Sequence, residues 1–163
     1  MLLSWTLYLL VPQLEDVSPL ILPRIKNETK RRVLDPLMER DDFWWMGLDE
    51  TVHPITGRVR RVNNWNPWII SNWLTAALVQ LDSESERVTH VEKAIRSLDR
   101  FIDPYPADGG CDEGPSYWGR AGASLFDCLE LLSSATDGAI NVYDEPKIQE
   151  IGRFVYRAQI ADR

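Results

Sequence analysis

Cysteine and histidine are scarce in this chain of 163 residues, which has two of each. Cys111 and Cys128 could form a disulfide, but nothing in their spacing requires one. Neither they nor His53 and His90 are spaced as metal ligands, so we expect no metal site and no cofactor. Cys128 falls on an apolar helix face and is predicted to be a small core residue, His90 on a polar helix face, and His53 in a loop.

Basic charge and long hydrophobic runs are also lacking. Lys and Arg together number 18 against 25 Asp and Glu, and the net charge of −7 argues against a nucleic-acid partner. The apolar run at residues 1–11 is too short to cross a bilayer, and it lacks the basic leader and cleavage site of a signal peptide. We therefore expect a buried helix there and no membrane partner. Both ends lie inside helical patterns, which predicts that residues 1–163 are part of one larger domain, truncated at both ends.

Apolar residues recur at helical spacing along most of the chain, and no alternating pattern typical of a strand is present. Proline, Ser and Asn mark the predicted starts at Ser18–Pro19, Asn66–Pro67 and Pro146, and residues 83–86 form a capping box. Pro36 is predicted to end the first of these helices, before a second short segment towards residues 43–45. The helix after the capping box has a predicted core face of Val88, Val91, Ile95, Leu98 and Ile102. A further helix is expected over residues 118–132.

The fold predicted from these patterns is all-α, an incomplete α/α toroid of antiparallel helical hairpins. No repeat motif recurs, which counts against a simple solenoid. In a toroid the long loops gather at one end and build a cleft. Two loops are therefore of interest, residues 58–66 and residues 108–117, and we expect them to lie side by side.

These two loops have unusual compositions. The first ends in NNWN at residues 63–66, where Asn66 is predicted to be the helix cap and Asn63 and Asn64 are unexplained. The second reads DGGCDEGPSYW at residues 108–118, and Pro115 suits the first turn of a helix that presents Tyr117. The alternative reading is structural: turn-forming Asn residues and a tight turn that ends in two core aromatics.

Together, NNWN and DGGCDEGPSYW resemble the heparinase II/III-like family, as do RRVLDP at residues 31–36 and FDCLELL at residues 126–132. The resemblance runs over nearly the whole chain. It implies part of an N-terminal α/α toroid that is followed by β-sandwich domains in the complete protein. It also implies a polysaccharide lyase that acts on uronate-containing acidic glycans such as heparan sulfate and alginate, secreted or periplasmic in its complete form.

The resemblance further implies roles for individual residues. β-Elimination removes the proton at C5 of a uronate and expels the O4 substituent. Asn64 matches the residue that grips the uronate carboxylate, and Tyr117 matches the catalytic tyrosine. Arg120, one helical turn later, is a candidate for favouring the ionised phenol, although an exposed neighbour at that spacing is common.

Asn63, Trp65, Trp118, Glu113 and Arg120 are the expected substrate-binding residues. Several characterised members carry His after the gripping Asn and after the catalytic Tyr, where this chain has Trp65 and Trp118. Tryptophan cannot transfer protons usefully, but it can stack on a sugar ring. Other family residues, a His and an Arg among them, lie later in the fold, so we expect the isolated chain to be inactive.

Two other functions remain open from the sequence. The first is an α/α-toroid glycoside hydrolase that uses Asp112 and Glu113, although adjacent carboxylates rarely make a working pair. The second is a non-catalytic glycan-binding helical module, with Trp65, Trp68 and Trp118 lining a groove. An unsaturated product separates elimination from hydrolysis, and binding without turnover would favour the module.

Overall fold

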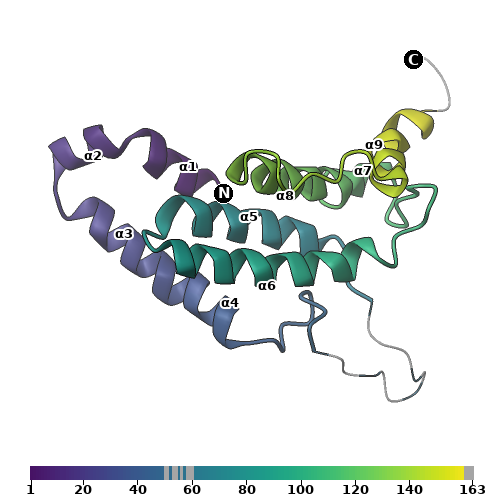
Figure 1. Ribbon diagram of the computed structural model, residues 1–163, viewed down its shortest axis with the longest axis horizontal. Coiled ribbons are helices and arrows are strands. Elements are labelled where there is room, and N and C mark those ends of the chain that lie inside the picture. Colours follow the sequence, from purple (N-terminus) through teal and green to yellow (C-terminus); the bar gives the residue numbers. More distant parts are fainter. Residues whose placement is uncertain (50–51, 53–54, 56, 58–60, 160–163) are drawn as a thin grey trace.

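The computed structural model describes residues 1–49, 52, 55, 57 and 61–159. This part of the chain is built from helices and contains no β-strand, which confirms the all-α class (Figure 1). In chain order the elements are α1 (Leu2–Leu9), α2 (Val11–Val17), α3 (Ile21–Thr29), the π-helix η1 (Lys30–Leu34), α4 (Asp35–Glu39), α5 (Trp65–Gln80), α6 (Glu84–Ile102), α7 (Pro115–Trp118), α8 (Gly122–Ala135) and α9 (Pro146–Arg157).

Helix α5 is the centre of the molecule. It packs against α6 and α8 along its length and against α1 and η1 elsewhere. Three residues, 81–83, join α5 to α6, and Figure 1 shows the two helices side by side as an antiparallel hairpin. Because α5 is apolar on most sides, it is buried on most sides. The core side chains at these contacts include Ile70, Trp73 and Leu74 of α5, Ala94 and Leu98 of α6, and Leu125 and Cys128 of α8.

The N-terminal helix is not buried, so that prediction is wrong. Only Ser4 and Leu7 of α1 are buried, whereas Leu2 is 82% exposed and Leu9 68% exposed. The reason is geometric, because α1 contacts α5 along one stripe and its other apolar side chains face outward. No helix in the described ranges is long and apolar enough to cross a membrane.

Proline acts differently from expectation in the first long helical segment. Helix α3 begins at Ile21, three residues after Ser18. The Ser18 hydroxyl accepts a hydrogen bond from the N–H of Leu20, just before the helix. Pro36 does not end the segment, because the wider π-turn η1 precedes it and α4 continues to Glu39. A π-turn changes the positions of the carbonyls that a proline ring would otherwise meet. The segment predicted towards residues 43–45 is a turn.

Helix α6 begins at the predicted capping box, where the Ser83 hydroxyl accepts a hydrogen bond from the Glu86 N–H at 3.4 Å. Its buried face is rotated from the predicted one, since Val88 is half exposed and His90 is buried. His90 Nδ1 accepts a hydrogen bond from Trp73 Nε1 at 2.9 Å, and desolvation lowers the His90 pKa. The prediction that His90 lies on a polar face is therefore wrong.

Of the last helices, α9 begins where predicted and the helix before it does not. Pro146 is the first residue of α9, as expected, and Ile148 and Ile151 are buried in it, whereas Val155 is largely exposed. The helix expected from residue 118 is divided, because α7 ends at Trp118 and α8 begins at Gly122. Both cysteines are buried and unpaired, and Cys128 lies in the core as predicted.

Candidate functional site

The two loops singled out in the sequence meet at the N-terminus of α5. The backbone N–H of Asn64 donates a hydrogen bond to Glu113 Oε2 at 3.2 Å, across 49 residues of sequence. Beside this contact, Arg61 Nη2 donates to the Pro104 carbonyl at 2.8 Å. The prediction that residues 63–66 and residues 108–118 lie side by side is therefore confirmed. His53 and residues 50–51, 54, 56 and 58–60 fall outside the described residues.

Of the three Asn residues of the first loop, Asn66 is not the helix cap that the sequence predicts. Asn64, not Asn66, precedes the first residue of α5, and its side chain makes no capping hydrogen bond. Asn66 is instead fully buried, and its Nδ2 donates to the carbonyls of Trp45 and Ser97 at 2.9 Å each. Asn63 Oδ1 accepts a hydrogen bond from the Trp65 N–H at 3.1 Å. Asn66 thus ties α5 to α6 and to the turn before the first loop.

The side chain of Asn64 is unusual for its surroundings. It is 4% exposed, and its Oδ1 is buried without a hydrogen-bond partner among the described residues. A buried amide oxygen without a donor is costly, so such a group invites a structural or functional explanation. Among the expected site residues, Asn64 is the one that has a buried side-chain atom without a hydrogen-bond partner in the described part of the chain.

The glycine-rich loop is held against α9 by close backbone contact. Gly109 has φ +72°, and a Cβ there would lie 2.1 Å from the carbonyl carbon of Glu150. No residue but glycine fits that approach, and Arg157 Nη2 reinforces it by donating to the carbonyls of Asp108 and Glu150 at 3.0 Å each. The loop is therefore anchored to α9 on one side and to α5 on the other.

Tyr117 and Trp118 face different surroundings at the end of this loop. Gly114, with φ +81°, precedes α7, and Pro115 is its first residue, as predicted. Tyr117 is 54% exposed. Trp118 is half-buried, and its indole N–H donates to the Ile151 carbonyl at 3.0 Å, so part of its surface packs on α9. Contact of Trp118 with a sugar stays a prediction.

Exposed aromatic rings surround the first turn of α5. The rings of Trp44 and Trp65 lie 5.5 Å apart between centroids, and both are partly exposed. Arg120 places its guanidinium carbon 4.5 Å from the centroid of the Trp68 ring, a cation–π arrangement. Arg120 therefore contacts the aromatic surface, and its predicted effect on the Tyr117 phenol is untested. Trp44 was missed as a site residue, although the FWW run at residues 43–45 was a signal.

The acidic residues of the second loop have separate partners. Asp112 Oδ2 lies 3.9 Å from Arg61 Nη1, whereas Glu113 is directed to the Asn64 backbone. Tyr105, near the start of the loop, is buried, and desolvation raises its pKa. The Tyr105 phenol is thus held neutral, and Tyr117 is the exposed tyrosine of the loop. In the described part of the chain, no group of three or more His, Cys, Asp and Glu residues could hold a metal ion.

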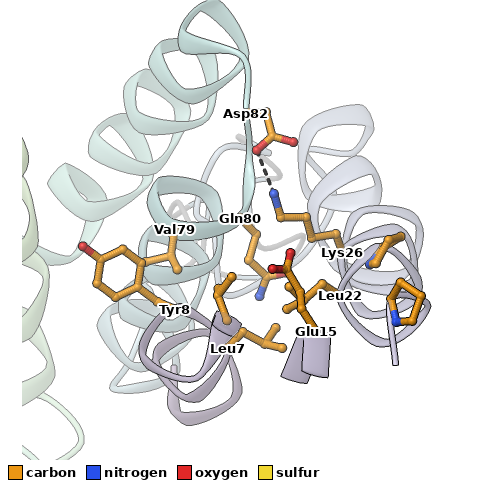
Figure 2. A pocket seen from close by; sticks show the side chains of 11 residues that line it. Leu7, Tyr8, Glu15, Leu22, Lys26, Val79, Gln80 and Asp82 are labelled. Carbon is orange, nitrogen blue, oxygen red and sulfur yellow. Dashed lines mark hydrogen bonds and ion pairs between the residues drawn. The ribbon is translucent and has the colours of Figure 1, made fainter. Parts of the chain in front are cut away.

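A cavity of ≈ 790 Å³ lies away from this site, at the C-terminal end of α5 (Figure 2). Its lining is mainly apolar, with Leu7, Tyr8 and Leu22 from α1 and α3, and the Lys26–Asp82 ion pair closes one edge. At about 1.5 Å per helical residue, Gln80 lies roughly 24 Å from Asn64. The cavity is therefore separate from the two loops.

Comparison with known proteins adds no assignment. No family model matches the chain, and no curated protein matches it either. A function is therefore inferred from the geometry of the two loops and from the residues that they contain.

Proposed function

We propose that this chain carries the substrate-contacting residues of a polysaccharide lyase similar to the heparinase II/III-like enzymes. The substrate would be an acidic, uronate-containing glycan, cleaved by β-elimination. The observation that carries the proposal is the hydrogen bond from Asn64 N–H to Glu113, because it joins the two loops of the resemblance at one end of α5.

The architecture is compatible with this proposal. The antiparallel α5–α6 hairpin, with α8 packed beside α5, is the arrangement from which an α/α toroid is built (Figure 1). In the proposal, residues 1–163 are one part of such a toroid, and β-sandwich domains follow in the complete protein. Both loops lie at the N-terminal end of α5, where one sugar ring could touch them together.

In the proposed reaction, the C5–H bond of the uronate breaks and its electron pair forms the C4=C5 double bond. The C4–O4 bond breaks in turn, and the leaving oxygen takes up a proton. Tyr117 would transfer protons at C5, O4 or both, because its exposed hydroxyl is open to a bound glycan. The Asn64 Nδ2 group would donate a hydrogen bond to the uronate carboxylate, where negative charge develops as the C5 proton leaves.

The aromatic rings around α5 would hold the glycan. Trp65 is 47% exposed beside Trp44, so the pair offers a face on which a sugar ring can stack. Arg120 is exposed over Trp68 and offers a positive charge to a carboxylate or sulfate. Asn63, which accepts a hydrogen bond from the Trp65 N–H at the helix start, would hold the backbone of Trp65 in position.

A non-catalytic glycan-binding module is the second candidate, and the exposed Trp44–Trp65 pair favours it. Such a module needs the aromatic surface but has no use for Tyr117 as a proton carrier. Glycoside hydrolysis is less well supported. Asp112 faces Arg61 while Glu113 faces the Asn64 backbone, so the two carboxylates do not converge on one point.

The test uses the longest chain that the gene encodes, incubated with alginate and with heparan sulfate. Formation of unsaturated uronate is followed by its ultraviolet absorbance. Tyr117→Phe should lower turnover by ~10²–10⁴-fold without unfolding the protein, because it removes one exposed hydroxyl. Asn64→Ala should lower turnover by ~10²–10³-fold, and Trp65→Ala should mainly weaken binding.

Three results distinguish the candidates. Unsaturated product that is lost in Tyr117→Phe supports the lyase. Glycan binding without product, weakened by Trp65→Ala and unchanged by Tyr117→Phe, supports the binding module. Unsaturated product formed at the wild-type rate by Tyr117→Phe would remove Tyr117 from the mechanism.

A further inference from the structure

The start of α5 departs from the usual way in which helices are capped. In a capping box, the side chain before the helix accepts the N–H of the third helical residue. The third residue then returns a carboxylate or amide to the backbone N–H of the cap. In α5 the cap is Asn64 and the third residue is Pro67, which has neither a backbone N–H nor a polar side chain. Both halves of a capping box are therefore impossible within this helix.

Glu113 supplies one of the missing halves from a distant loop. Its Oε2 accepts the Asn64 N–H at 3.2 Å, which is the hydrogen bond that a residue at position 67 would make in a capping box. A carboxylate at a helix N-terminus also interacts favourably with the helix dipole. The neighbouring N–H of Trp65 is satisfied by Asn63 Oδ1, so the first turn is capped without any contribution from the Asn64 side chain.

We propose that Glu113 is a positioning residue that caps α5 in trans, by accepting the Asn64 N–H, and thereby holds the Asn64 side chain in place for a ligand. Pro67 has no N–H for the Asn64 side chain to accept, which leaves that side chain without a capping role, and Glu113 supplies the other half of the box by accepting the Asn64 N–H. The buried, unpartnered Oδ1 of Asn64 is the expected consequence. The same hydrogen bond fixes the loop of Tyr117 against Asn64. The capping itself stands on the geometry, whereas its importance for catalysis rests on the proposed function.

Amide hydrogen exchange, measured by NMR on the protein, tests this directly. In Glu113→Ala the backbone N–H of Asn64 should exchange with solvent about 5–30-fold faster. This is the range that corresponds to the free energy of losing a helix cap. Glu113→Gln keeps an acceptor oxygen at the same reach, so it should restore most of the protection. Asp112→Ala is the matched control, because it removes the adjacent and more exposed carboxylate that does not contact Asn64.

The amide of Leu98, in the buried centre of α6, reports general destabilisation. Faster exchange at Asn64 with unchanged exchange at Leu98 supports a local cap. Unchanged exchange at Asn64 in Glu113→Ala would overturn the proposal, and so would equal acceleration at both amides or in Asp112→Ala. These results do not depend on turnover.

Turnover tests the positioning role separately. If unsaturated product is formed, Glu113→Ala should lower kcat and Glu113→Gln should recover it. A protein in which Tyr117→Phe abolishes turnover while Glu113→Ala leaves it unchanged would refute positioning by Glu113 and leave the lyase assignment intact.

Discussion

Gly109 provides a sharp test of how the glycine-rich loop is anchored. Its φ of +72° costs other residues about 1–2 kcal/mol. A Cβ would also lie 2.1 Å from the Glu150 carbonyl carbon and 2.2 Å from its oxygen, both rigid backbone atoms of α9. Relieving such overpacking costs a further ~1–3 kcal/mol. We therefore expect Gly109→Ala to lower the free energy of unfolding by about 2–5 kcal/mol.

Gly138 is the matched control, since it also has a positive φ, +81°, but no atom within 4 Å of its Cβ position. Gly138→Ala should therefore cost only the backbone part, about 1–2 kcal/mol. Urea unfolding of both variants measures the difference, and the NMR signal of the Trp118 indole N–H reports whether the loop has left α9. Equal destabilisation by the two substitutions, with an unshifted indole signal, would refute the close contact between Gly109 and α9.

Three further predictions concern buried polar groups. Burial lowers the His90 pKa, so the unfolded chain binds a proton more readily than the folded chain does. The free energy of unfolding, measured with urea, should therefore fall as the pH drops below about 6.5. His90→Asn should make this fall with pH smaller. Asn66→Asp keeps the size of the side chain but loses two buried hydrogen bonds that Nδ2 donates, so it should lower the free energy of unfolding by at least ~2 kcal/mol in the same assay. Asn63→Asp keeps the oxygen that accepts the Trp65 N–H, so it should leave stability nearly unchanged. Lys93→Met removes the ammonium that donates to the carbonyls of Met38 and Arg40 at the end of α4, and it should lower the free energy of unfolding by about 1–3 kcal/mol. Arg96→Met, on the exposed side of α6, should not have this effect.

Local sequence signals predicted the helices well where a single residue decides the start. The Ser83 capping box and Pro146 both mark helix starts in the structure, because each acts through its own backbone neighbours. Pro115 also begins α7 as expected, preceded by a glycine at positive φ. Such signals need no knowledge of what packs where.

The errors arose where a distant partner decides. Asn64 and Asn66 are equally good caps by sequence, and the difference is that Asn66 meets carbonyls of Trp45 and Ser97 in the core. His90 is polar by composition, yet the Trp73 indole N–H makes its buried position favourable. The α6 face predicted from aliphatic spacing was rotated for the same reason, since hydrogen bonds to neighbouring elements draw polar side chains inward.

The position of the candidate site was predictable because it depends on the ends of elements. Two loops that flank packed helices at the same end must lie near one another, and Asn64 and Glu113 do. The cap by Glu113 was not predictable, because it requires knowing that Pro67 cannot complete a capping box and that a carboxylate from another loop lies within 3.2 Å. The aromatic pair of Trp44 and Trp65 was missed because the turn at residues 43–46 brings Trp44 to the start of α5.

Several departures from local rules lie at this end of the molecule. Asn64 precedes a helix without capping it by its side chain, its Oδ1 is buried without a partner, and Gly114 has φ +81° close by in sequence to Glu113. A buried amide oxygen without a partner costs stability, and sequences that fold well keep such costs for places where a ligand or a reaction needs them. The buried Asn64 oxygen and the Glu113 contact are visible without any family resemblance, so Asn64 and Glu113 remain site candidates for a different glycan or a different reaction.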